Sequence, residues 1–392
     1  MPHITSQRVS ISRCGTYEPE TVADALAEVL EPLGGMKAFV RSSQRVCIKP
    51  NLLMKATPDR AVTTHPALLR AVIREVKACG AAEVLVGDSP GGRQNANGIR
   101  SAWEVTGWAG VCEEEGATLV LFDDDVVRVP TPGSTLFSAF NLGRAAVEAD
   151  VLIDLPKLKT HGFQQFTGAV KNLFGCIPGL EKAQFHLKVP DRYDFGVMLV
   201  DLLLACKPTL AVMDAVVGME GEGPGGGDPI RIGALLASAD CVALDVVASA
   251  VAGFDPMEVY TNKAAHARGL GPRSADEIDV AGVAWRDIAP GSFKKPARDV
   301  SSRLPAGVGR WIRERIASRP FLARPDDCTS CATCAKNCPV GAIEMRDSRP
   351  AFDYGPCIRC YCCQELCPPQ AIGLKTPWLV RAVIARETGR KA

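Results

Sequence analysis

The chain has 392 residues, 47% of them hydrophobic, and a formal net charge of +1. This length predicts one or two larger domains together with a small one. The near-zero charge argues against a nucleic-acid-binding protein. The first residues lack a basic segment followed by an apolar one, and no apolar run reaches the roughly 18–20 residues of a membrane span. We therefore expect neither a signal peptide nor a membrane-spanning segment.

Residues 1–295 alternate between short apolar runs and amphipathic segments, as α/β domains do. The clearest helix is predicted at residues 66–78, where apolar residues recur at helical spacing until Cys79-Gly80. Further helices are predicted near residues 20–30 and 241–252. Strands are predicted at residues 8–11, 45–48, 83–86, 117–122, 151–155, 210–213 and 232–237. We expect a largely parallel sheet with helices on both faces.

Polar segments follow three of the predicted strands. They are Lys49-Pro50-Asn51, Asp88-Ser89-Pro90-Gly91-Gly92 and Lys157-Leu158-Lys159-Thr160-His161. In parallel sheets, ligands bind where loops leave the carboxyl ends of strands. The sequence therefore predicts that substrate is bound by Lys49, Asn51, Asp88, Lys157 and Lys159. For Lys159, a solvated surface lysine is the alternative.

The densest group of reactive side chains lies between Leu155 and Lys188. His161, Lys171 and His186 have glycine and amide neighbours there, and cations beside glycine suit a site that grips carboxylate or phosphate. His65 precedes a predicted helix whose N-terminus would favour an anion. Imidazoles exchange protons near neutral pH. The predicted catalytic residues are His65, His161, Lys171 and His186, with a helix cap as the alternative for His65.

A predicted strand ending near Asp214 leads into a glycine-rich acidic segment that contains Glu220 and runs to Asp228. Asp214 and Glu220 are candidates for positioning a substrate or a metal. The segment lacks the Gly-Lys-Ser/Thr of a P-loop and the helix context of a dinucleotide-binding motif. A flexible surface loop is the alternative.

Residues 296–322 are richer in Arg, Pro and Ser and are predicted to be a linker with a short basic helix at Val308–Ala317. Residues 377–392 are predicted to form an amphipathic tail helix. The segment between them, residues 323–376, holds two copies of one cysteine spacing, offset by 29 residues from Cys328 to Cys357. The cysteines of the two copies are Cys328, Cys331, Cys334 and Cys338, then Cys357, Cys360, Cys363 and Cys367.

This spacing is the bacterial iron–sulfur run, in which the fourth cysteine of each copy ligates the cluster of the other copy. It predicts two [4Fe–4S] clusters, one of them held by Cys328, Cys331, Cys334 and Cys367. The second would be held by Cys357, Cys360, Cys363 and Cys338. Zinc fits poorly, because zinc sites separate their cysteine pairs by a longer gap.

Eight other cysteines do not occupy these ligand positions. Cys362 lies between two ligand cysteines and is interpreted as a bystander. The seven cysteines from Cys14 to Cys241 show no ligand spacing. Free thiols beside iron–sulfur clusters indicate a reducing compartment, the cytoplasm.

Residues 323–376 resemble a bacterial two-cluster ferredoxin, a small α+β domain. Residues from about 8 to 290 resemble the domain of unknown function 362 family, whose members often carry a C-terminal ferredoxin module. That resemblance rests on Lys49–Leu52, Thr64–Pro66, Gly87–Pro90, Pro156–His161, Lys171–Gly175 and Asp214–Gly225. A looser likeness to lactate racemases rests on His65, Lys171, Pro178-Gly179 and His186. It implies a small carboxylate or hydroxy-acid ligand, although nothing identifies the racemase's nickel cofactor.

These features predict an iron–sulfur oxidoreductase that passes electrons through two [4Fe–4S] clusters to an anionic small molecule or cofactor in the α/β domain. Its expected partner is an electron donor or acceptor such as a ferredoxin. Two alternatives stay open. One is an electron-transfer or maturation protein without its own substrate chemistry, and the other is a non-redox, isomerase-like domain acting on a small carboxylate. An additional flavin or metal and the oligomeric state are not specified by the sequence.

Overall fold

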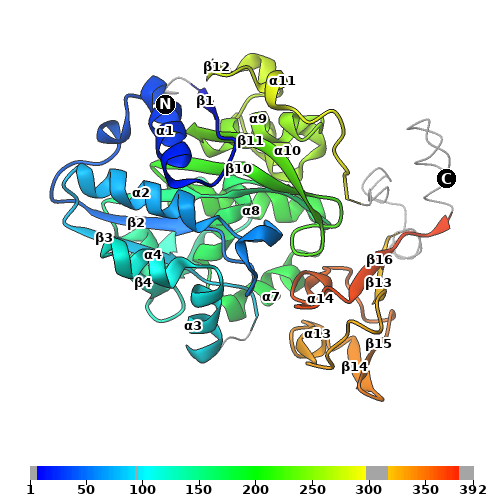
Figure 1. The fold of residues 1–392 in the computed structure, drawn as a ribbon. Coiled ribbons are helices and arrows are strands. Elements are labelled where there is room, and N and C mark those ends of the chain that lie inside the picture. Colours follow the sequence, from blue (N-terminus) through cyan, green and yellow to red (C-terminus); the bar gives the residue numbers. More distant parts are fainter. Residues whose placement is uncertain (1–6, 93–95, 297–316, 379–392) are drawn as a thin grey trace.

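The structure, a computed structural model, describes residues 7–92, 96–296 and 317–378. Figure 1 shows an α/β body, coloured blue to yellow, and a smaller C-terminal module in orange and red beside its lower edge. Most of the predicted linker helix and of the predicted tail helix lies outside the described residues.

A mostly parallel sheet of ten strands forms the centre of the body. Strand β11 is antiparallel to both of its neighbours, and β9 is antiparallel to β8, whereas the other pairings are parallel. The main path runs β12 (Asp279–Gly282), β1 (Arg8–Arg13), β11 (Asp228–Ser238), β10 (Leu210–Glu220), β7 (Val151–Leu155), β2 (Arg45–Pro50), β3 (Glu83–Asp88) and β4 (Thr118–Leu121). Off this path, β8 (Lys157–His161) pairs with β10, and β9 (Gln165–Thr167) pairs with β8.

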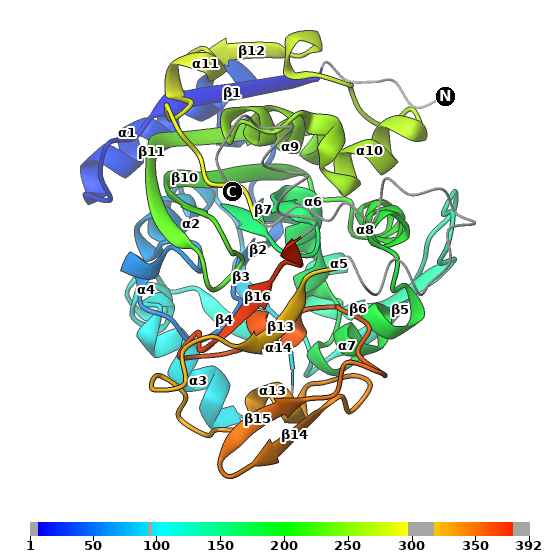
Figure 2. The ribbon, with the colours of Figure 1, turned by 90° about the vertical axis from the view of Figure 1, so that its right-hand side faces the viewer.

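Helices cover both faces of the sheet, which confirms the predicted fold class (Figures 1 and 2). Because side chains alternate along a strand, Val151 and Ile153 of β7 face one apolar core and Leu152 faces the other. The first core is closed by α1 (Pro19–Leu30), α2 (Pro66–Ala78), α3 (Ala96–Val105) and α4 (Trp108–Glu115). The second is closed by α5 (Arg144–Val147), α6 (Ala169–Asn172), α8 (Arg192–Cys206), α9 (Cys241–Val251) and α10 (Tyr260–Ala267).

The reactive stretch between Leu155 and Lys188 is more regular than the sequence suggested. It forms β8, β9, α6, a short 3₁₀ turn and α7 (Gly179–Lys188).

Elsewhere β5 (Val126–Pro130) and β6 (Ala139–Gly143) form an antiparallel hairpin, and α11 (Trp285–Ile288) follows β12. The 3₁₀ turns are Glu31–Leu33, Met36–Ala38, Pro58–Arg60, Leu173–Cys176, Pro256–Glu258 and Ala275–Glu277.

The C-terminal module is a small α+β unit built from two similar halves. Its elements are β13 (Arg319–Leu322), α13 (Thr333–Lys336), β14 (Ile343–Arg346), β15 (Arg349–Phe352), α14 (Cys362–Glu365) and β16 (Ile372–Lys375). Strand β13 pairs with β16, and β14 with β15, both antiparallel. The 29-residue repeat reappears in the backbone, because α13 and α14 occupy equivalent positions. Positive φ angles also recur at equivalent pairs, Ser330 and Arg359, Ala332 and Tyr361, and Gly341 and Gln370.

The module docks on the body through Tyr361. This residue is only 2% exposed and belongs to the same apolar core as Phe195 of α8. Its hydroxyl accepts a hydrogen bond from Arg192 Nη2 and donates one to the carbonyl of Ser318, both at 3.0 Å. Tyr361 therefore joins the second half of the module to the body.

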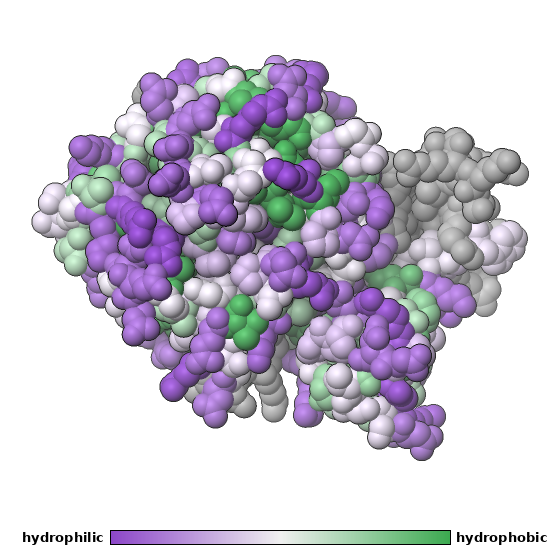
Figure 3. Space-filling view, viewed as in Figure 1, coloured by the Kyte–Doolittle hydropathy of each residue, from purple (hydrophilic) through white to green (hydrophobic). Residues whose placement is uncertain are grey.

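No helix in the described part of the chain is long and apolar enough to cross a membrane. On the face shown in Figure 3, hydrophilic side chains predominate and hydrophobic ones gather in smaller patches.

Candidate ligand pocket and cysteine cavities

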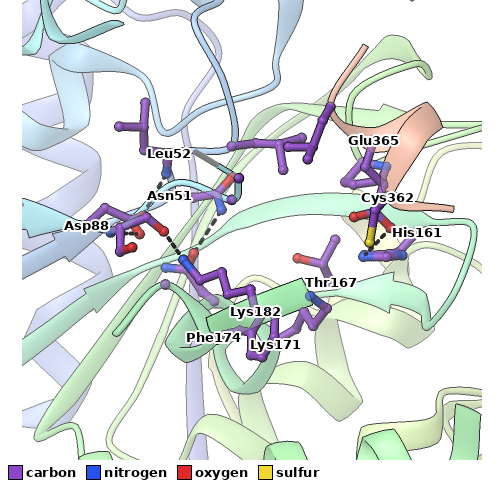
Figure 4. A pocket seen from close by; sticks show the side chains of 18 of the residues that line it. Asn51, Leu52, Asp88, His161, Thr167, Lys171, Phe174, Lys182, Cys362 and Glu365 are labelled. Carbon is purple, nitrogen blue, oxygen red and sulfur yellow. Dashed lines mark hydrogen bonds and ion pairs between the residues drawn. The ribbon is translucent and has the colours of Figure 1, made fainter. Parts of the chain in front are cut away.

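A pocket lies where the carboxyl ends of β2, β3 and β8 meet the C-terminal module (Figure 4). The space between protein atoms there is about 800 Å³, including its opening to solvent. The module contributes Asn337, Cys362, Glu365 and Leu366 to the wall, and the body contributes the rest. The pocket is therefore incomplete without the module.

A buried ion pair forms the floor of the pocket. Lys49 Nζ lies 2.8 Å from Asp88 Oδ2 and also donates to Asn172 Oδ1 at 3.2 Å. Although burial disfavours its charge, Asp88 and Asp154 raise the pKa of Lys49 above its usual value. Asp88 also accepts backbone hydrogen bonds from Leu52 and Ser89. Its oxygens are thus engaged by the protein, and the pair orders the floor.

A glycine allows this close packing. A Cβ at Gly175 would collide with Asp88 Oδ1 and Lys49 Nζ, so a larger residue cannot lie here without moving the pair. Gly175 is part of the Lys171–Gly175 motif of the sequence. The motif thus combines a pocket cation with the turn that closes the floor.

Two amides connect the floor to a second lysine. Asn51 Nδ2 donates to Asn172 Oδ1 at 2.9 Å, and Asn51 Oδ1 accepts from Lys159 Nζ at 2.6 Å. Lys159 also donates to the carbonyl of Val62. Burial, together with the charges of Lys157 and Lys171, lowers the pKa of Lys159 to about 7. Lys159 is buried in the pocket wall rather than solvated, and it can exchange a proton near neutral pH.

Two further lysines line the pocket. Lys171 Nζ lies 4.6 Å from the centre of the Phe174 ring and has no hydrogen-bond or ion-pair partner among the described residues. Burial lowers the pKa of Lys171, and Glu365 opposes that shift. Lys182, on α7, donates to the carbonyl of Ser89, and burial lowers its pKa to about 8. Lys171 is thus the cation best placed to meet an anionic ligand.

Two histidines and one module carboxylate also line the pocket, and Figure 4 shows His161 beside Glu365. His161 Nδ1 accepts the backbone N–H of Phe163 at 3.0 Å, which leaves the proton on Nε2, 3.4 Å from Glu365 Oε1. Burial lowers the pKa of His161 well below its usual value and that of His186 to about 3. Both rings are therefore neutral at physiological pH. Burial raises the pKa of Glu365 to about 7, against the charges of Lys171 and Lys159.

Three buried polar atoms of residues lining the pocket lack hydrogen-bond partners among the described residues. They are Ser89 Oγ, His186 Nδ1 and Glu365 Oε1. Buried polar groups in folded proteins are almost always hydrogen-bonded, to protein, water or ligand. Three such atoms belong to residues that line the same pocket as the unpaired ammonium of Lys171, which fits a site for a polar ligand.

Other predicted site residues form a separate, largely buried cluster that does not line the pocket. Lys157 Nζ lies 2.8 Å from both Asp214 Oδ2 and the Tyr17 hydroxyl. The His65 ring stacks on Tyr17 at 3.5 Å, and His65 Nδ1 caps α2 by accepting the N–H of Ala67. Burial lowers the pKa of His65 to about 4. These polar atoms satisfy one another, so the cluster holds β8, β10 and α2 together.

The glycine-rich acidic segment also lies apart from the pocket floor. Glu220 is the last residue of β10, and its Oε2 accepts the backbone N–H of Lys294 at 2.7 Å. The following loop contacts the module, because Gln364 donates to the carbonyl of Glu222 and Gln370 to that of Gly225. Only Pro224 of this loop lines the pocket. The segment therefore contributes mainly to docking.

The structure adds pocket residues that the sequence analysis did not select, among them Ser89, Asn172, Lys182, Cys362 and Glu365. For Lys182 a signal was available, since it lies four residues before His186 and shares its helix face. For Cys362 and Glu365 the signal was a difference between the two copies of the repeat. The equivalent residues in the first copy are Thr333 and Lys336.

The ligand-position cysteines surround two cavities in the module. One is lined by Cys328, Cys331, Cys334 and Cys367, and the other by Cys338, Cys357, Cys360 and Cys363. Each cavity thus receives three cysteines from one half and the fourth from the other, and their volumes are similar, about 310 and 330 Å³. The other lining residues are mostly apolar, such as Leu322, Ile343 and Phe352. The donor set and its arrangement fit a thiolate-bound cluster in each cavity.

Cys362 belongs to both regions. It is the one residue shared by the walls of the ligand pocket and of the second cysteine cavity, within the described residues. It is 7% exposed. One residue therefore borders both spaces.

An α/β body joined to a cysteine-lined module defines an iron–sulfur-binding protein. The chain belongs to the family described as domain of unknown function (DUF362), whose model matches residues 46–250. A 4Fe-4S dicluster domain matches residues 321–368. Both predicted resemblances are thereby confirmed, and so is [4Fe–4S] binding by the C-terminal module.

Related proteins cover each part of the chain. The thylakoid-associated protein sll1697 of Synechocystis sp. is 38% identical over 275 residues, which is 68% of this chain and 81% of that protein. Ferredoxin-2 of Chlorobaculum tepidum is 38% identical over 53 residues, 12% of this chain and 86% of the ferredoxin. The lactate racemase apoprotein of Thermoanaerobacterium thermosaccharolyticum is 17% identical with a TM-score of 0.39, over 64% of this chain and 58% of the racemase. That score is too low to bear on function.

Proposed function

We propose that the protein is an iron–sulfur oxidoreductase in which two [4Fe–4S] clusters exchange electrons with an anionic small molecule in the pocket. The observation that carries the proposal is the position of Cys362, which lines both the pocket and the second cysteine cavity. A ligand in the pocket would lie one side chain away from that cavity. When bound, such clusters supply one-electron transfer at low potential.

The charges of the pocket support an anionic ligand. Lys49, Lys159, Lys171 and Lys182 line it, against the carboxylates Asp88 and Glu365. Because Lys49 and Asp88 neutralise each other, the remaining lysines outnumber Glu365. Lys171 is the primary anion-binding residue in this proposal, and Lys182 supports it. Lys159, with its pKa lowered to about 7, can hold or release a proton at Nζ.

The first half of the module supports a route for electrons from outside. Cys331 of the first cavity is exposed, whereas Cys360 and Cys363 of the second are buried. We assign the first half to an external electron partner such as a ferredoxin, and the second half to the pocket. The buried free thiols of the body, among them Cys14, Cys47 and Cys176, favour a reducing compartment, the cytoplasm.

The test begins with protein purified without oxygen. Two clusters require about eight iron atoms per chain, and mass spectrometry identifies any small molecule released on denaturation. That compound is then added back to protein whose clusters have been reduced and freed of excess reductant. Reoxidation of the clusters by a bound anion is expected. Eight irons with no releasable ligand would favour the electron-relay alternative, and binding without reoxidation would favour the isomerase-like one.

A further inference from the structure

The module supplies a buried hydrogen-bond acceptor to the pocket. Glu365, the last residue of α14, is 8% exposed, and its Oε1 has no hydrogen-bond partner among the described residues. The Nε2 of the neutral His161 ring lies 3.4 Å from this oxygen. The equivalent residue in the first half, Lys336, is exposed. The two halves therefore differ at this position. The second half places the carboxylate of Glu365 in the pocket wall, whereas the first half exposes the ammonium of Lys336 to solvent.

The ammonium of Lys171 and the carboxylate of Glu365 line the pocket together without touching. No hydrogen bond or ion pair joins them in the described part of the chain, although each charge affects the other's pKa. Because the two groups line one pocket and are not paired with each other, one ligand can contact both. Its anionic group would bind Lys171, and Glu365 would then need a donor from the same ligand.

The ligand group that donates a hydrogen bond to Glu365 should carry no charge. A second negative group would be repelled by Glu365, and a positive group would face the ammonium groups of Lys171, Lys159 and Lys182. A hydroxyl satisfies an orphan acceptor without either penalty. Leaving a buried acceptor unpaired is costly, so a site with such an acceptor rejects analogues that lack the donor.

We infer that Glu365 is a specificity-determining residue, which accepts a hydrogen bond from a hydroxyl on an anionic ligand whose negative group binds Lys171. This inference rests on the proposed anion site. It places ligand selection partly in the iron–sulfur module, so that the compound chosen for binding lies beside Cys362 and the second cysteine cavity.

The test compares glycolate with acetate, which carry the same charge and differ by one hydroxyl. Binding to the full-length, cluster-loaded protein is measured by isothermal titration calorimetry. The wild type should bind glycolate roughly tenfold more tightly than acetate, the worth of one hydrogen bond to a charged group. Glu365→Met should lose this preference while still binding acetate. Lys336→Met, the matched change in the first half, should keep it.

The outcomes separate the inference from the proposed function. If the wild type binds both compounds equally, or if Glu365→Met weakens both alike, Glu365 does not select the hydroxyl, although the anion site stands. If neither compound binds, and Lys171→Met changes nothing, the anion site itself is wrong. Iron content and circular dichroism verify that each variant is loaded and folded. Glu365→Gln, which keeps an acceptor oxygen, should retain part of the preference and serves if the methionine variant does not fold.

Discussion

The two halves of the C-terminal module share a backbone but have different neighbours. Both carry the same cysteine spacing, a four-residue helix and positive φ angles at equivalent residues. Ala332, Thr333 and Lys336 of the first half are replaced by Tyr361, Cys362 and Glu365 in the second. Tyr361 packs in the core of the body, and Cys362 and Glu365 line the pocket. The three equivalent residues of the first half do neither. The spacing of the cysteines determines the two cysteine cavities. The residues between the cysteines determine whether each half packs against the body or faces solvent.

The largest difference should follow removal of one ligand cysteine from each half. Cys331→Ala and Cys363→Ala should each lose about four iron atoms per chain, because each removes one ligand of one cluster. Iron analysis and electron paramagnetic resonance measure this loss. Only Cys363→Ala should also weaken binding of acetate, because Cys363 lies within α14 beside Cys362 and Glu365. Unchanged iron in either variant would refute its ligand assignment.

Removing the unpaired pocket cation should weaken anion binding strongly. Lys171→Met deletes a charged hydrogen-bond donor, so acetate should bind about 10- to 100-fold more weakly, as measured by calorimetry. Lys188→Met is the matched control, because Lys188 is an exposed residue on α7 outside the pocket. Iron content should not change in either variant. Equal affinities in the two variants would remove Lys171 from the site.

Anion binding should weaken as the pH rises through about 7. Burial lowers the pKa of Lys159 to about 7, so this lysine is charged below that pH and neutral above it. Acetate stays ionised over this range, so a change in affinity reflects protonation of groups on the protein and not of the ligand. Calorimetry between pH 6 and 8 should show a decline of up to roughly tenfold. Lys159→Met should remove the part of the slope that the lysine carries, and a slope identical to that of the wild type would contradict its role.

The smallest effect should come from the docking residue of the second half. Tyr361→Phe removes the hydroxyl that contacts Arg192 and Ser318, which should cost about 1 kcal/mol, or about fivefold in local opening. Hydrogen–deuterium exchange of the α14 amides should become faster by that factor. Tyr354→Phe, which breaks a hydrogen bond to Pro320 inside the module, should leave α14 exchange unchanged. If the two variants exchange alike, Tyr361 does not anchor α14.

Much of the pocket was predictable because it follows the rule for parallel sheets. Lys49, Asn51 and Asp88 come from strand ends, and the structure brings them together with Lys159, His161, Lys171 and His186. Lys157 was selected by the same reasoning but lies outside. It precedes Lys159 on the same face of β8, and two residues along a strand span about 6.5 Å. That distance is enough to place it with Tyr17 and Asp214 instead of the pocket.

Residues whose neighbours are distant in sequence were less predictable. Asp214 and His65 have the residue types of a site, yet their polar atoms are satisfied by Tyr17, Lys157 and the backbone of α2. Cys362 was interpreted as a bystander because it fits no ligand position. Its place between two cavities depends on how the module docks, and local spacing carries no information about docking.

The sequence by itself determined the chemistry of the module and the class of the body. Cysteine spacing is a local property, because loops of fixed length must place thiolates around a cluster, and hydrophobic periodicity likewise determines strands and helices locally. Only the tertiary structure decided that the second half of the module completes the pocket, and that Lys171 faces Glu365 without a partner. Those relations join residues nearly two hundred positions apart. They arise from packing between two units, which the order of residues along either unit does not specify.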